Sequence, residues 1–391
     1  MFALGLPLAA VAGGFSIETT YWFYRDLKLQ AAADASAFAA AIEKRAGADL
    51  LKVESVARLA AEDNGFNPVR DVILVNSPPT TGEFQHSDAV EVVLTSTAQR
   101  FFTALFMSSD VGIKARSVAR YTTAQNACVL ALSPSASRAA DFSGAADLNL
   151  SGCSVMANSM AADAINVQGS ATLSTDCLIS VGGVQVNSSV TMAQCPSPIV
   201  DAPPVADPFS DVPAPEPSGV CKSAPPNPTG SYTLSPGRYC RGMSISGAGN
   251  LDPGIYYVDG DFSISANSSL SGSGVTLYIT GSGRVTMNGN ATVDLQAPTS
   301  GPYAGMLFFG DRANGSGGTN RFNGTAGSSM TGAIYFAAQA IEYSGNFSGV
   351  NGCTQVVGRT VQWSGRASLS VDCSANGLKT IPAYSTVKLS E

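Results

Sequence analysis

The stretch Leu234-Ser-Pro-Gly-Arg-Tyr239 returns almost unchanged as Leu251-Asp-Pro-Gly-Ile-Tyr256, and this repeat is the strongest indication of the fold. Short runs that alternate apolar and polar residues surround it, such as Ile165-Asn-Val167 and Val285-Thr-Met287, separated by Gly, Asn and Ser. Recurrent short strands are typical of a solenoid, in which each coil buries its apolar face only against its neighbours. We therefore predict a right-handed parallel β-helix (solenoid); a β-sandwich is the alternative, because isolated strands look alike in both folds.

The cysteines support the same fold. Residues stacked on adjacent coils lie about 4.8 Å apart, inside the roughly 4.4–6.8 Å between Cα atoms that a disulfide spans. Taken in order, the cysteines pair at separations close to one coil, so we predict four sequential disulfides and an oxidising compartment. Buried free thiols are the alternative. The eight cysteines are Cys128, Cys153, Cys177, Cys195, Cys221, Cys240, Cys353 and Cys373.

Residues 196–230 are rich in proline and divide this region of the chain. Proline cannot donate a hydrogen bond to a sheet, so this segment is not a central strand. We predict a first β-helix block over residues 125–195, a strap or linker over 196–230, and a second block over 231–391. Cys195 and Cys221 near the ends of the segment favour a strap across the coils over a tether between two blocks.

The N-terminal residues 1–17 contain no charged side chain, and aromatic residues follow at positions 21–24. As a helix this segment would be about 26 Å long, slightly short of a hydrocarbon core of about 30 Å. Tyr and Trp favour the membrane interface. A cleaved signal peptide would need a basic start, which is missing here. We predict that residues 1–24 are a membrane anchor, a single transmembrane helix; a removed signal is the alternative.

An alanine-rich helix is expected to continue from this anchor as far as residue 47. Small residues on its faces would let another helix approach closely. We predict that the helix packs against partner subunits; the alternative is an ordinary helix that lies on its own domain. The residues expected at the partner contact are Leu29, Ala33, Ala37 and Ala40.

Residues 48–124 combine helical and strand patterns and predict a small α+β module. A helix over 48–63 would end at the turn pair Asn64-Gly65. A second, amphipathic helix is expected over 97–107. The expected strands are residues 69–75, 88–95 and 111–122.

Four segments within the first 125 residues resemble the TadE/TadG-like proteins of tight-adherence (Flp, type IVc) pili. They are Leu29-Gln-Ala-Ala-Ala-Asp-Ala-Ser-Ala-Phe-Ala-Ala-Ala41, Ala89-Val-Glu-Val-Val-Leu94, Phe101-Phe-Thr-Ala-Leu-Phe106 and Ile113-Lys-Ala-Arg-Ser-Val-Ala-Arg120. The resemblance covers about the first 125 residues. It implies a pilin-like module in a minor pilin or pseudopilin, held in the bacterial inner membrane with its bulk on the periplasmic or extracellular side. The implied partners are other pilus-assembly proteins or pilin subunits.

Charge and composition exclude several functions. The net charge is −7, the pI is near 4.8, and charged residues make up 13% of the chain. Nucleic-acid binding needs clustered Lys and Arg, so we predict no nucleic-acid partner. His86 is the single histidine, which makes a Cys/His metal site improbable. We expect no metal and no other cofactor.

Catalysis is considered because parallel β-helices also house polysaccharide lyases and hydrolases, which need carboxylates gathered on one face. The spacing Asp259-x-Asp261 would place two carboxylates on one face of a strand. However, Asp259-Gly260 is also an ordinary turn dipeptide, and carboxylates at turns are common. We therefore predict no enzyme activity. The further candidates are Asp294, Arg284 and the pair Asp311-Arg312.

One more pattern resembles a metal motif. Asp261-Phe-Ser-Ile-Ser265 matches the Asp-x-Ser-x-Ser motif of von Willebrand A domains, but that motif needs a parallel sheet surrounded by helices. Three functions stay open from the sequence: a structural pilus component, a surface adhesin that binds glycan or an abiotic surface, and a polysaccharide-acting enzyme.

Overall fold

The computed structural model describes residues 2–45, 48–121, 125–225, 230–315, 317–344, 353–370, 373–384 and 387–390. Within these ranges the side chains of residues 2–12, 125, 151, 367, 368, 370 and 374 are not described. The chain forms two compact units: unit 1 is Met1–Ala124 with Ser385–Glu391, and unit 2 is Gln125–Tyr384.

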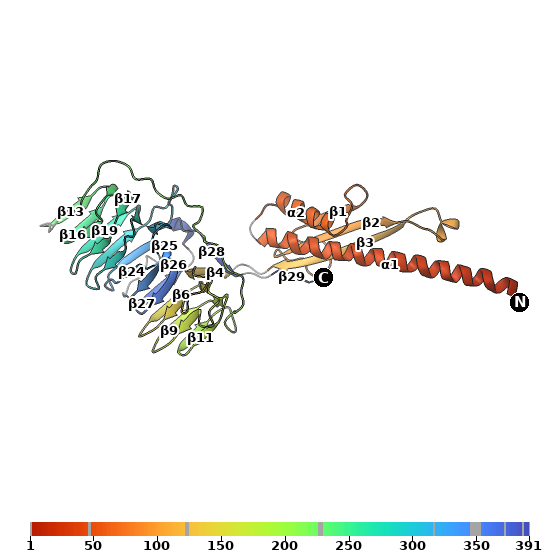
Figure 1. Ribbon diagram of the computed structural model, residues 1–391, viewed down its shortest axis with the longest axis horizontal. Coiled ribbons are helices and arrows are strands. Elements are labelled where there is room, and N and C mark those ends of the chain that lie inside the picture. Colours follow the sequence, from red (N-terminus) through yellow and green to blue (C-terminus); the bar gives the residue numbers. More distant parts are fainter. Residues whose placement is uncertain are drawn as a thin grey trace. The chain divides into compact units, whose positions relative to one another are not determined.

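Unit 1 has a long helix, a short helix and an antiparallel sheet (Figure 1). Helix α1 spans Phe2–Arg45 without a break, and α2 spans Leu50–Asp63. The Asp49 side chain caps α2 by accepting a hydrogen bond from the Lys52 backbone N–H at 2.9 Å, as N-cap residues do. The strands, in the sheet order β1-β2-β3-β29, are Val72–Asn76, Ala89–Ala98, Val111–Tyr121 and Val387–Leu389.

The alanine face of α1 covers this sheet. The small side chains let the helix axis lie close to the strands, and they share a core with Val53 of α2 and Val92 of β2. All are nearly or fully buried. The prediction that they contact a partner helix is therefore corrected: they fill the core of their own unit. The residues concerned are Leu29, Ala33, Ala37 and Ala40.

Two further expectations for unit 1 are corrected. Residues 97–107 do not form an amphipathic helix, because β2 runs on to Ala98 and only the short 3-10 helix Thr103–Leu105 follows. The second block was expected to continue to residue 391. Instead, the chain leaves the solenoid after Tyr384, and Val387–Leu389 pairs with β3.

The predicted anchor, residues 1–24, falls partly on residues 1–12, whose side chains lie outside the described part of the chain. In the part of the chain whose side chains are described, no helix has the length and apolar character needed to cross a membrane. Glu18 is only 1% exposed, and the Trp22 Nε1 atom donates to the Gln99 carbonyl at 3.2 Å. Residues 18–22 thus lie against their own unit.

Unit 2 is a parallel β-solenoid. One coil contains β16, β17 and β18, and each pairs in parallel with the corresponding strand of the next coil, β19, β20 and β21. The parallel ladders confirm the solenoid prediction and exclude the β-sandwich.

Before the proline-rich segment 196–230, the strands β4 to β12 are Gln125–Ala131, Ala140–Phe142, Asp147–Ser151, Ser154–Ala157, Ile165–Val167, Thr172–Thr175, Leu178–Ser180, Val184–Val186 and Ser189–Met192. After it, β13 to β28 are Ser231–Leu234, Gly237–Tyr239, Met243–Ile245, Ala248–Leu251, Gly254–Asp259, Phe262–Ile264, Ser269–Ser273, Val275–Thr280, Val285–Met287, Thr292–Gln296, Met306–Gly310, Thr319–Phe322, Ser329–Tyr343, Thr354–Trp363, Arg366–Ser370 and Ile381–Tyr384.

The sequence repeat builds the same corner in two coils. In both copies Pro-Gly turns the chain, and the glycines take the positive φ angles that side chains disfavour (Gly237 +137°, Gly254 +142°). The Tyr239 hydroxyl donates to the Ser235 carbonyl at 3.0 Å, and the Tyr256 hydroxyl to that of Asp252 at 2.9 Å. The two rings stack with their centroids 6.0 Å apart. The repeat is thus a corner motif that places one tyrosine above another.

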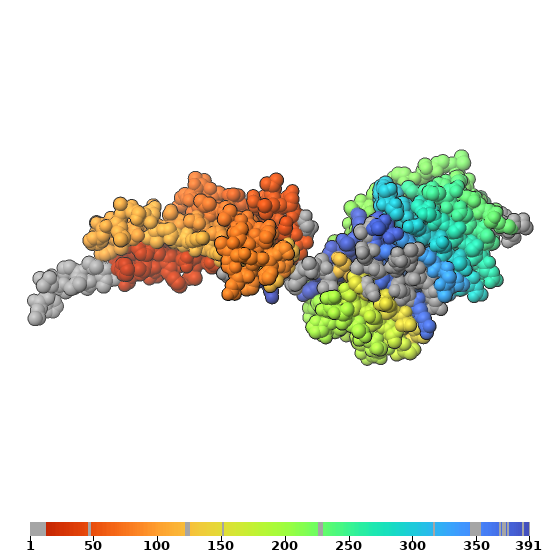
Figure 2. Space-filling view, turned by 180° about the vertical axis from the view of Figure 1, so that it is seen from behind, coloured from red at the N-terminus to blue at the C-terminus, as the bar shows by residue number. Residues whose placement is uncertain are grey.

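The two predicted blocks form one stack. Strand β26, near the end of the chain, pairs in parallel with β4 and β5, and β27 pairs with β6. Figures 1 and 2 show the blue C-terminal strands beside the yellow-green strands of the first block. The chain therefore builds one end of the stack first, crosses to the other end, and coils back to the middle.

Residues 196–230, the strap, make this crossing, and their described part lies along the coils. At one end the Ile199 N–H donates to the Leu178 carbonyl at 2.8 Å, and Asn158 makes two hydrogen bonds with the Val205 backbone. At the other end the Lys222 N–H donates to the Arg238 carbonyl at 2.7 Å. Main-chain pairing at both ends fixes the strap to coils that are far apart in the sequence.

All four predicted disulfides are confirmed. Their Cα–Cα distances of 5.3–5.7 Å lie inside the range of roughly 4.4–6.8 Å that a disulfide spans. Two of the disulfides join the ends of the strap to the solenoid, at Cys195 and Cys221. The pairs are Cys128–Cys153, Cys177–Cys195, Cys221–Cys240 and Cys353–Cys373.

Candidate functional site

The carboxylates considered for catalysis do not form a pair on one strand. Asp259 ends β17 and Asp261 follows the turn at Gly260, so the two lie on either side of a corner. Asp259 is 3.8 Å from the Arg238 guanidinium. Asp261 accepts a hydrogen bond from the Arg284 backbone N–H at 3.0 Å. Each carboxylate has its own structural partner, so the expectation that they share a strand face is corrected.

Arg312, the other cation considered for catalysis, holds the strap. Its guanidinium donates to the strap carbonyls of Phe209 and Val212, and its Nε atom donates to the Tyr335 hydroxyl at 2.8 Å. Tyr335 in turn donates to Asp207 of the strap at 2.6 Å. Burial raises the pKa of Tyr335, and the hydrogen bond to Asp207 raises it further. These contacts give Arg312 a structural role where the strap crosses the solenoid.

The remaining candidates are dispersed. Asp311 accepts hydrogen bonds from Thr280 and from the Ala313 N–H, Asp294 lies exposed on β22, and His86 is exposed in a loop of unit 1. Within the described ranges, His, Cys, Asp and Glu side chains do not gather in threes as a metal site would require.

One face of the solenoid carries regularly spaced polar side chains. Strands β27, β6, β9 and β12 pair in parallel in that order. On β6, Leu148 and Leu150 point inward and are buried, while Asp147 and Asn149 are exposed. The same alternation on β9 and β12 creates two rows of small polar side chains, which we call the polar ladder. Its residues are Asp147, Asn149, Thr172, Ser174, Ser189 and Thr191.

The register makes these rows straight. Asp147 is level with Thr172, which is level with Ser189, and neighbouring strands lie about 4.8 Å apart. The Thr172 hydroxyl donates to Asp147 at 2.6 Å. The ladder residues line a shallow depression of about 320 Å³. A polymer whose hydroxyl groups repeat at a similar spacing could hydrogen-bond to ladder residues on several strands at once.

A similar row lies on the other half of the solenoid. Thr233, Asn250, Ser271 and Asp294 are exposed and follow one another in register on β13, β16, β19 and β22. The Ser271 hydroxyl donates to the Asn250 side chain at 3.1 Å. Hydroxyl and amide groups can donate or accept hydrogen bonds without a net charge. They suit neutral, hydroxyl-rich ligands better than ionic ones.

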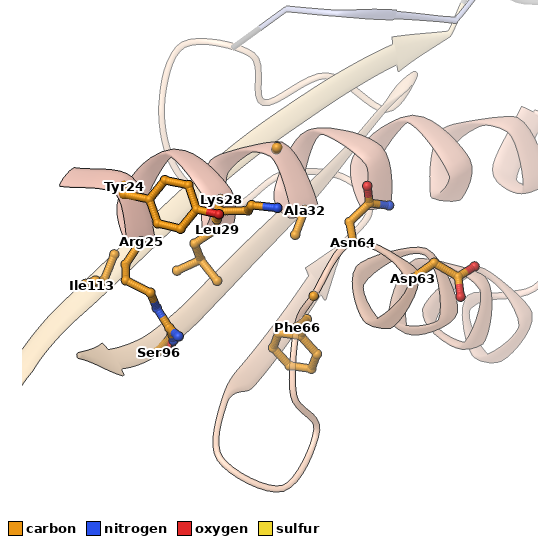
Figure 3. Close-up of a pocket in the computed structure, with 12 residues that line it drawn as sticks. Tyr24, Arg25, Lys28, Leu29, Ala32, Asp63, Asn64, Phe66, Ser96 and Ile113 are labelled. Atoms are coloured by element: carbon orange, nitrogen blue, oxygen red, sulfur yellow. Dashed lines mark hydrogen bonds between the residues drawn. The ribbon is translucent and has the colours of Figure 1, made fainter. Parts of the chain in front are cut away.

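Unit 1 has a separate cavity of about 510 Å³ between α1, the end of α2, and strands β2 and β3 (Figure 3). Arg25 points from α1 to Ser96 and donates to its hydroxyl at 3.3 Å, and Ser96 donates to Asp71 at 2.6 Å. Lys28 lies 5.9 Å from the centre of the Tyr24 ring. The cavity combines an apolar floor, which includes Leu29, with cationic groups on α1.

The polar ladder was missed as a site because Ser, Thr and Asn were interpreted as turn residues and spacers. The signal was present: Leu148-Asn-Leu150 and Thr172-Leu173-Ser174 alternate with the same phase, which predicts that their polar residues share a face. Only the register of the coils shows that these residues form continuous rows.

Comparison with known proteins gave no match to a protein-family model, a curated protein or a solved structure. The fold and its surfaces thus define the class on their own: a disulfide-bonded parallel β-solenoid joined to a small helix-and-sheet unit.

Proposed function

We propose that this chain is a structural component of tight-adherence (Flp) pilus biogenesis, a minor pilin or pseudopilin held in the inner membrane by its N-terminal segment. Its solenoid would lie on the periplasmic or extracellular side, where disulfides form. The resemblance of residues 29–120 to TadE/TadG-like proteins supports this proposal. The observation that carries it is α1, a single helix of 44 residues that joins the apolar N-terminal segment to the alanine face over the sheet.

The face of α1 that could bind a partner is the one away from the sheet. Leu27, Phe38 and Ile42 are 53%, 41% and 36% exposed, respectively. Phe38 and Ile42 are one turn apart, and Leu27 lies three turns earlier on the same side of the helix. An apolar stripe of this kind is a candidate protein contact. We therefore assign the partner contact to these residues in place of the buried alanines.

Cross-linking in intact membranes, followed by recovery of the full-length chain, tests this proposal. We expect pilus-assembly proteins or pilin subunits to be recovered with the chain. The triple substitution Leu27→Glu, Phe38→Glu and Ile42→Glu should remove most of the cross-linked product. A matched control, Leu51→Glu with Leu59→Glu on the exposed face of α2, should leave the product unchanged. Recovery of the chain without any pilus protein would contradict the proposal.

A second candidate function is adhesion to a glycan, and the polar ladder favours it. Hydroxyl, amide and carboxylate groups in rows at a fixed spacing offer many hydrogen bonds to a polymer whose hydroxyl groups repeat regularly. Each hydrogen bond is weak, about 1 kcal/mol net. Several ladder residues that bind the same polymer would together give a measurable affinity for the glycan.

Binding of the full-length chain to insoluble polysaccharides, such as cellulose and chitin, tests this candidate. Thr172→Lys with Ser174→Lys should weaken binding about tenfold or more, because one residue in each row is blocked, at about 1.4 kcal/mol or more in total. The control is Ser244→Lys with Ser263→Lys, two neighbouring residues elsewhere on the solenoid. Equal binding by both variants would refute adhesion through the ladder.

A further inference from the structure

The loop between β2 and β3 carries an unusual set of exposed apolar side chains. Leu105 and Phe106 are 78% and 75% exposed, and Phe101 and Met107 are also exposed. Contiguous apolar side chains on the surface of a soluble domain mark a binding face. We call residues 101–107 the apolar loop.

The apolar loop is fastened to the first turns of α1 that have described side chains. The Glu18 carboxylate is buried and accepts hydrogen bonds from the backbone N–H groups of Phe101, at 2.6 Å, and Thr103, at 2.9 Å. The Tyr21 and Phe101 rings meet edge to face, 5.1 Å apart. These contacts hold the loop in place while Leu105 and Phe106 stay in solvent.

Gly14 shows how closely the loop approaches the helix. A methyl group placed on Gly14 would lie only 2.6 Å from the Phe102 ring, so a larger residue would push the loop away. Phe15 and Ile17, on the same stretch of α1, are 52% and 74% exposed. These two side chains point to different sides of α1, but both lie on the stretch of helix that the loop contacts. With the apolar loop they make up an exposed apolar patch around the start of the described helix.

The border of this patch resembles a membrane interface. The Arg100 guanidinium lies 5.3 Å from the centre of the Trp22 ring, and Phe23 and Tyr24 are exposed on the next turn of α1. Aromatic and basic residues are favoured where an apolar face meets lipid headgroups. The nearby Glu18 carboxylate is buried and accepts two backbone hydrogen bonds, so it is not exposed on this surface.

We propose that the apolar loop inserts into a phospholipid bilayer beside the N-terminal segment of α1, as a second membrane contact. The continuity of the helix identifies the occupant: residues 1–17 have no charged side chain, and α1 runs from Phe2 through this segment into the patch. Side chains at an interface reach about 5–10 Å into the headgroup and acyl boundary. The inference rests on the proposed membrane attachment, and it adds that unit 1 lies on the bilayer surface.

The test uses the full-length chain with vesicles of phosphatidylcholine and phosphatidylglycerol, in which part of the phosphatidylcholine is brominated. Bromine quenches tryptophan fluorescence only at short range. Leu105→Trp adds a reporter to the apolar loop, and Leu51→Trp adds a matched one to the exposed face of α2, where Leu51 is 77% exposed. We expect brominated lipid to quench the added emission of Leu105→Trp by about half or more, and that of Leu51→Trp very little.

A second variant measures the contribution of the loop to affinity. Leu105→Ser with Phe106→Ser should lower vesicle affinity about tenfold or more, since each large apolar side chain contributes when buried in lipid. Leu51→Ser with Leu59→Ser should leave it unchanged. All four residues are exposed, so these variants should fold.

The outcomes distinguish insertion of the apolar loop from the membrane attachment on which this inference rests. Sedimentation of the chain with vesicles, without quenching of Leu105→Trp, would overturn the inference and leave membrane attachment intact. Failure of the unaltered chain to sediment with vesicles would overturn both. Quenching of Leu105→Trp and Leu51→Trp to the same extent would also refute a specific role for the loop.

Discussion

Unit 1 and unit 2 are stabilised by different means. Unit 1 has no cysteine; one long helix lies on an antiparallel sheet, and an ion pair between the buried Glu91 and the half-buried Arg116 joins strands β2 and β3. Unit 2 is a stack of parallel coils with four disulfides and an aromatic interior. We therefore expect acid to destabilise mainly unit 1 and reducing agents to destabilise mainly unit 2.

The chain allows this contrast to be measured. It has two tryptophans, Trp22 in unit 1 and Trp363 in the core of unit 2. The variant Trp363→Phe leaves Trp22 as a reporter of unit 1, and Trp22→Phe leaves Trp363 as a reporter of unit 2. The following predictions, from the largest expected effect to the smallest, use these reporters or circular dichroism.

Truncation of the aromatic interior should have the largest effect. Phe308 is fully buried and contacts Phe262 and Phe322 edge to face, at 5.9 and 5.2 Å between centroids. Phe308→Ala should destabilise unit 2 by about 3–5 kcal/mol, because it removes apolar contacts and leaves a cavity. Chemical denaturation followed by Trp363 emission measures this. An unchanged midpoint for unit 2, or an equal shift in unit 1, would contradict the account.

Reduction of the disulfides should come next. A loop of 18 to 25 residues contributes about 3 kcal/mol in the chain-entropy model. Cys353→Ser with Cys373→Ser should therefore lower the stability of unit 2 by about that amount. The unfolding of unit 1, followed by Trp22, should not respond to a reductant. Loss of both transitions on reduction would show that the units do not unfold independently.

Acid should weaken unit 1 selectively. Burial by itself would raise the pKa of the Glu91 carboxyl, but hydrogen bonds from Thr81, Asn76 and Arg116 lower it from 4.5 to about 2. Because the folded pKa lies below the unfolded value, this stabilisation is present above pH 4.5 and is lost as the pH falls towards 2. The loss should be on the order of 2–3 kcal/mol.

The pH dependence of Trp22 emission during denaturation checks this expectation. Glu91→Gln should remove most of the change in stability between pH 5 and 2 in unit 1 (about 2–3 kcal/mol in the unaltered chain). The same pH dependence in Glu91→Gln and the unaltered chain would assign it to other groups.

Removal of one corner hydroxyl should have the smallest effect. The buried Tyr256 hydroxyl lies 2.7 Å from the Leu234 carbonyl and 2.9 Å from that of Asp252. Tyr256→Phe should cost unit 2 about 1 kcal/mol, since the ring stays and only a hydrogen bond is lost. Tyr257→Phe, on a half-buried neighbour, is the matched control. A larger cost for the control would mean that the corner motif has no special role.

The local features of the solenoid could be predicted because they depend on short-range pattern. The repeat from Leu234 to Tyr256 and the spacing of cysteines such as Cys353 and Cys373 follow from stacking of neighbouring coils. The joining of β26 to β4 could not be predicted, because the sequence does not specify which coil ends meet after the strap has crossed.

In unit 1 the composition of a helix face did not reveal what covers it. The face with Ala33 and Ala37 suits close approach equally well by a partner helix or by the chain's own sheet, and long-range packing decides between them. The polar ladder needed the register of β6, β9 and β12, and the role of Glu18 needed a loop more than 80 residues away.

Localisation of the full-length chain in its native cells tests the central claim most directly. Cells are fractionated into membranes, sheared surface filaments and culture fluid, and an antibody to the solenoid detects the chain in each fraction. The account predicts that the chain is found in the membranes or filaments, together with pilus proteins, and is shifted by reductant on a denaturing gel. A chain found free in the culture fluid, without any pilus protein, would contradict it.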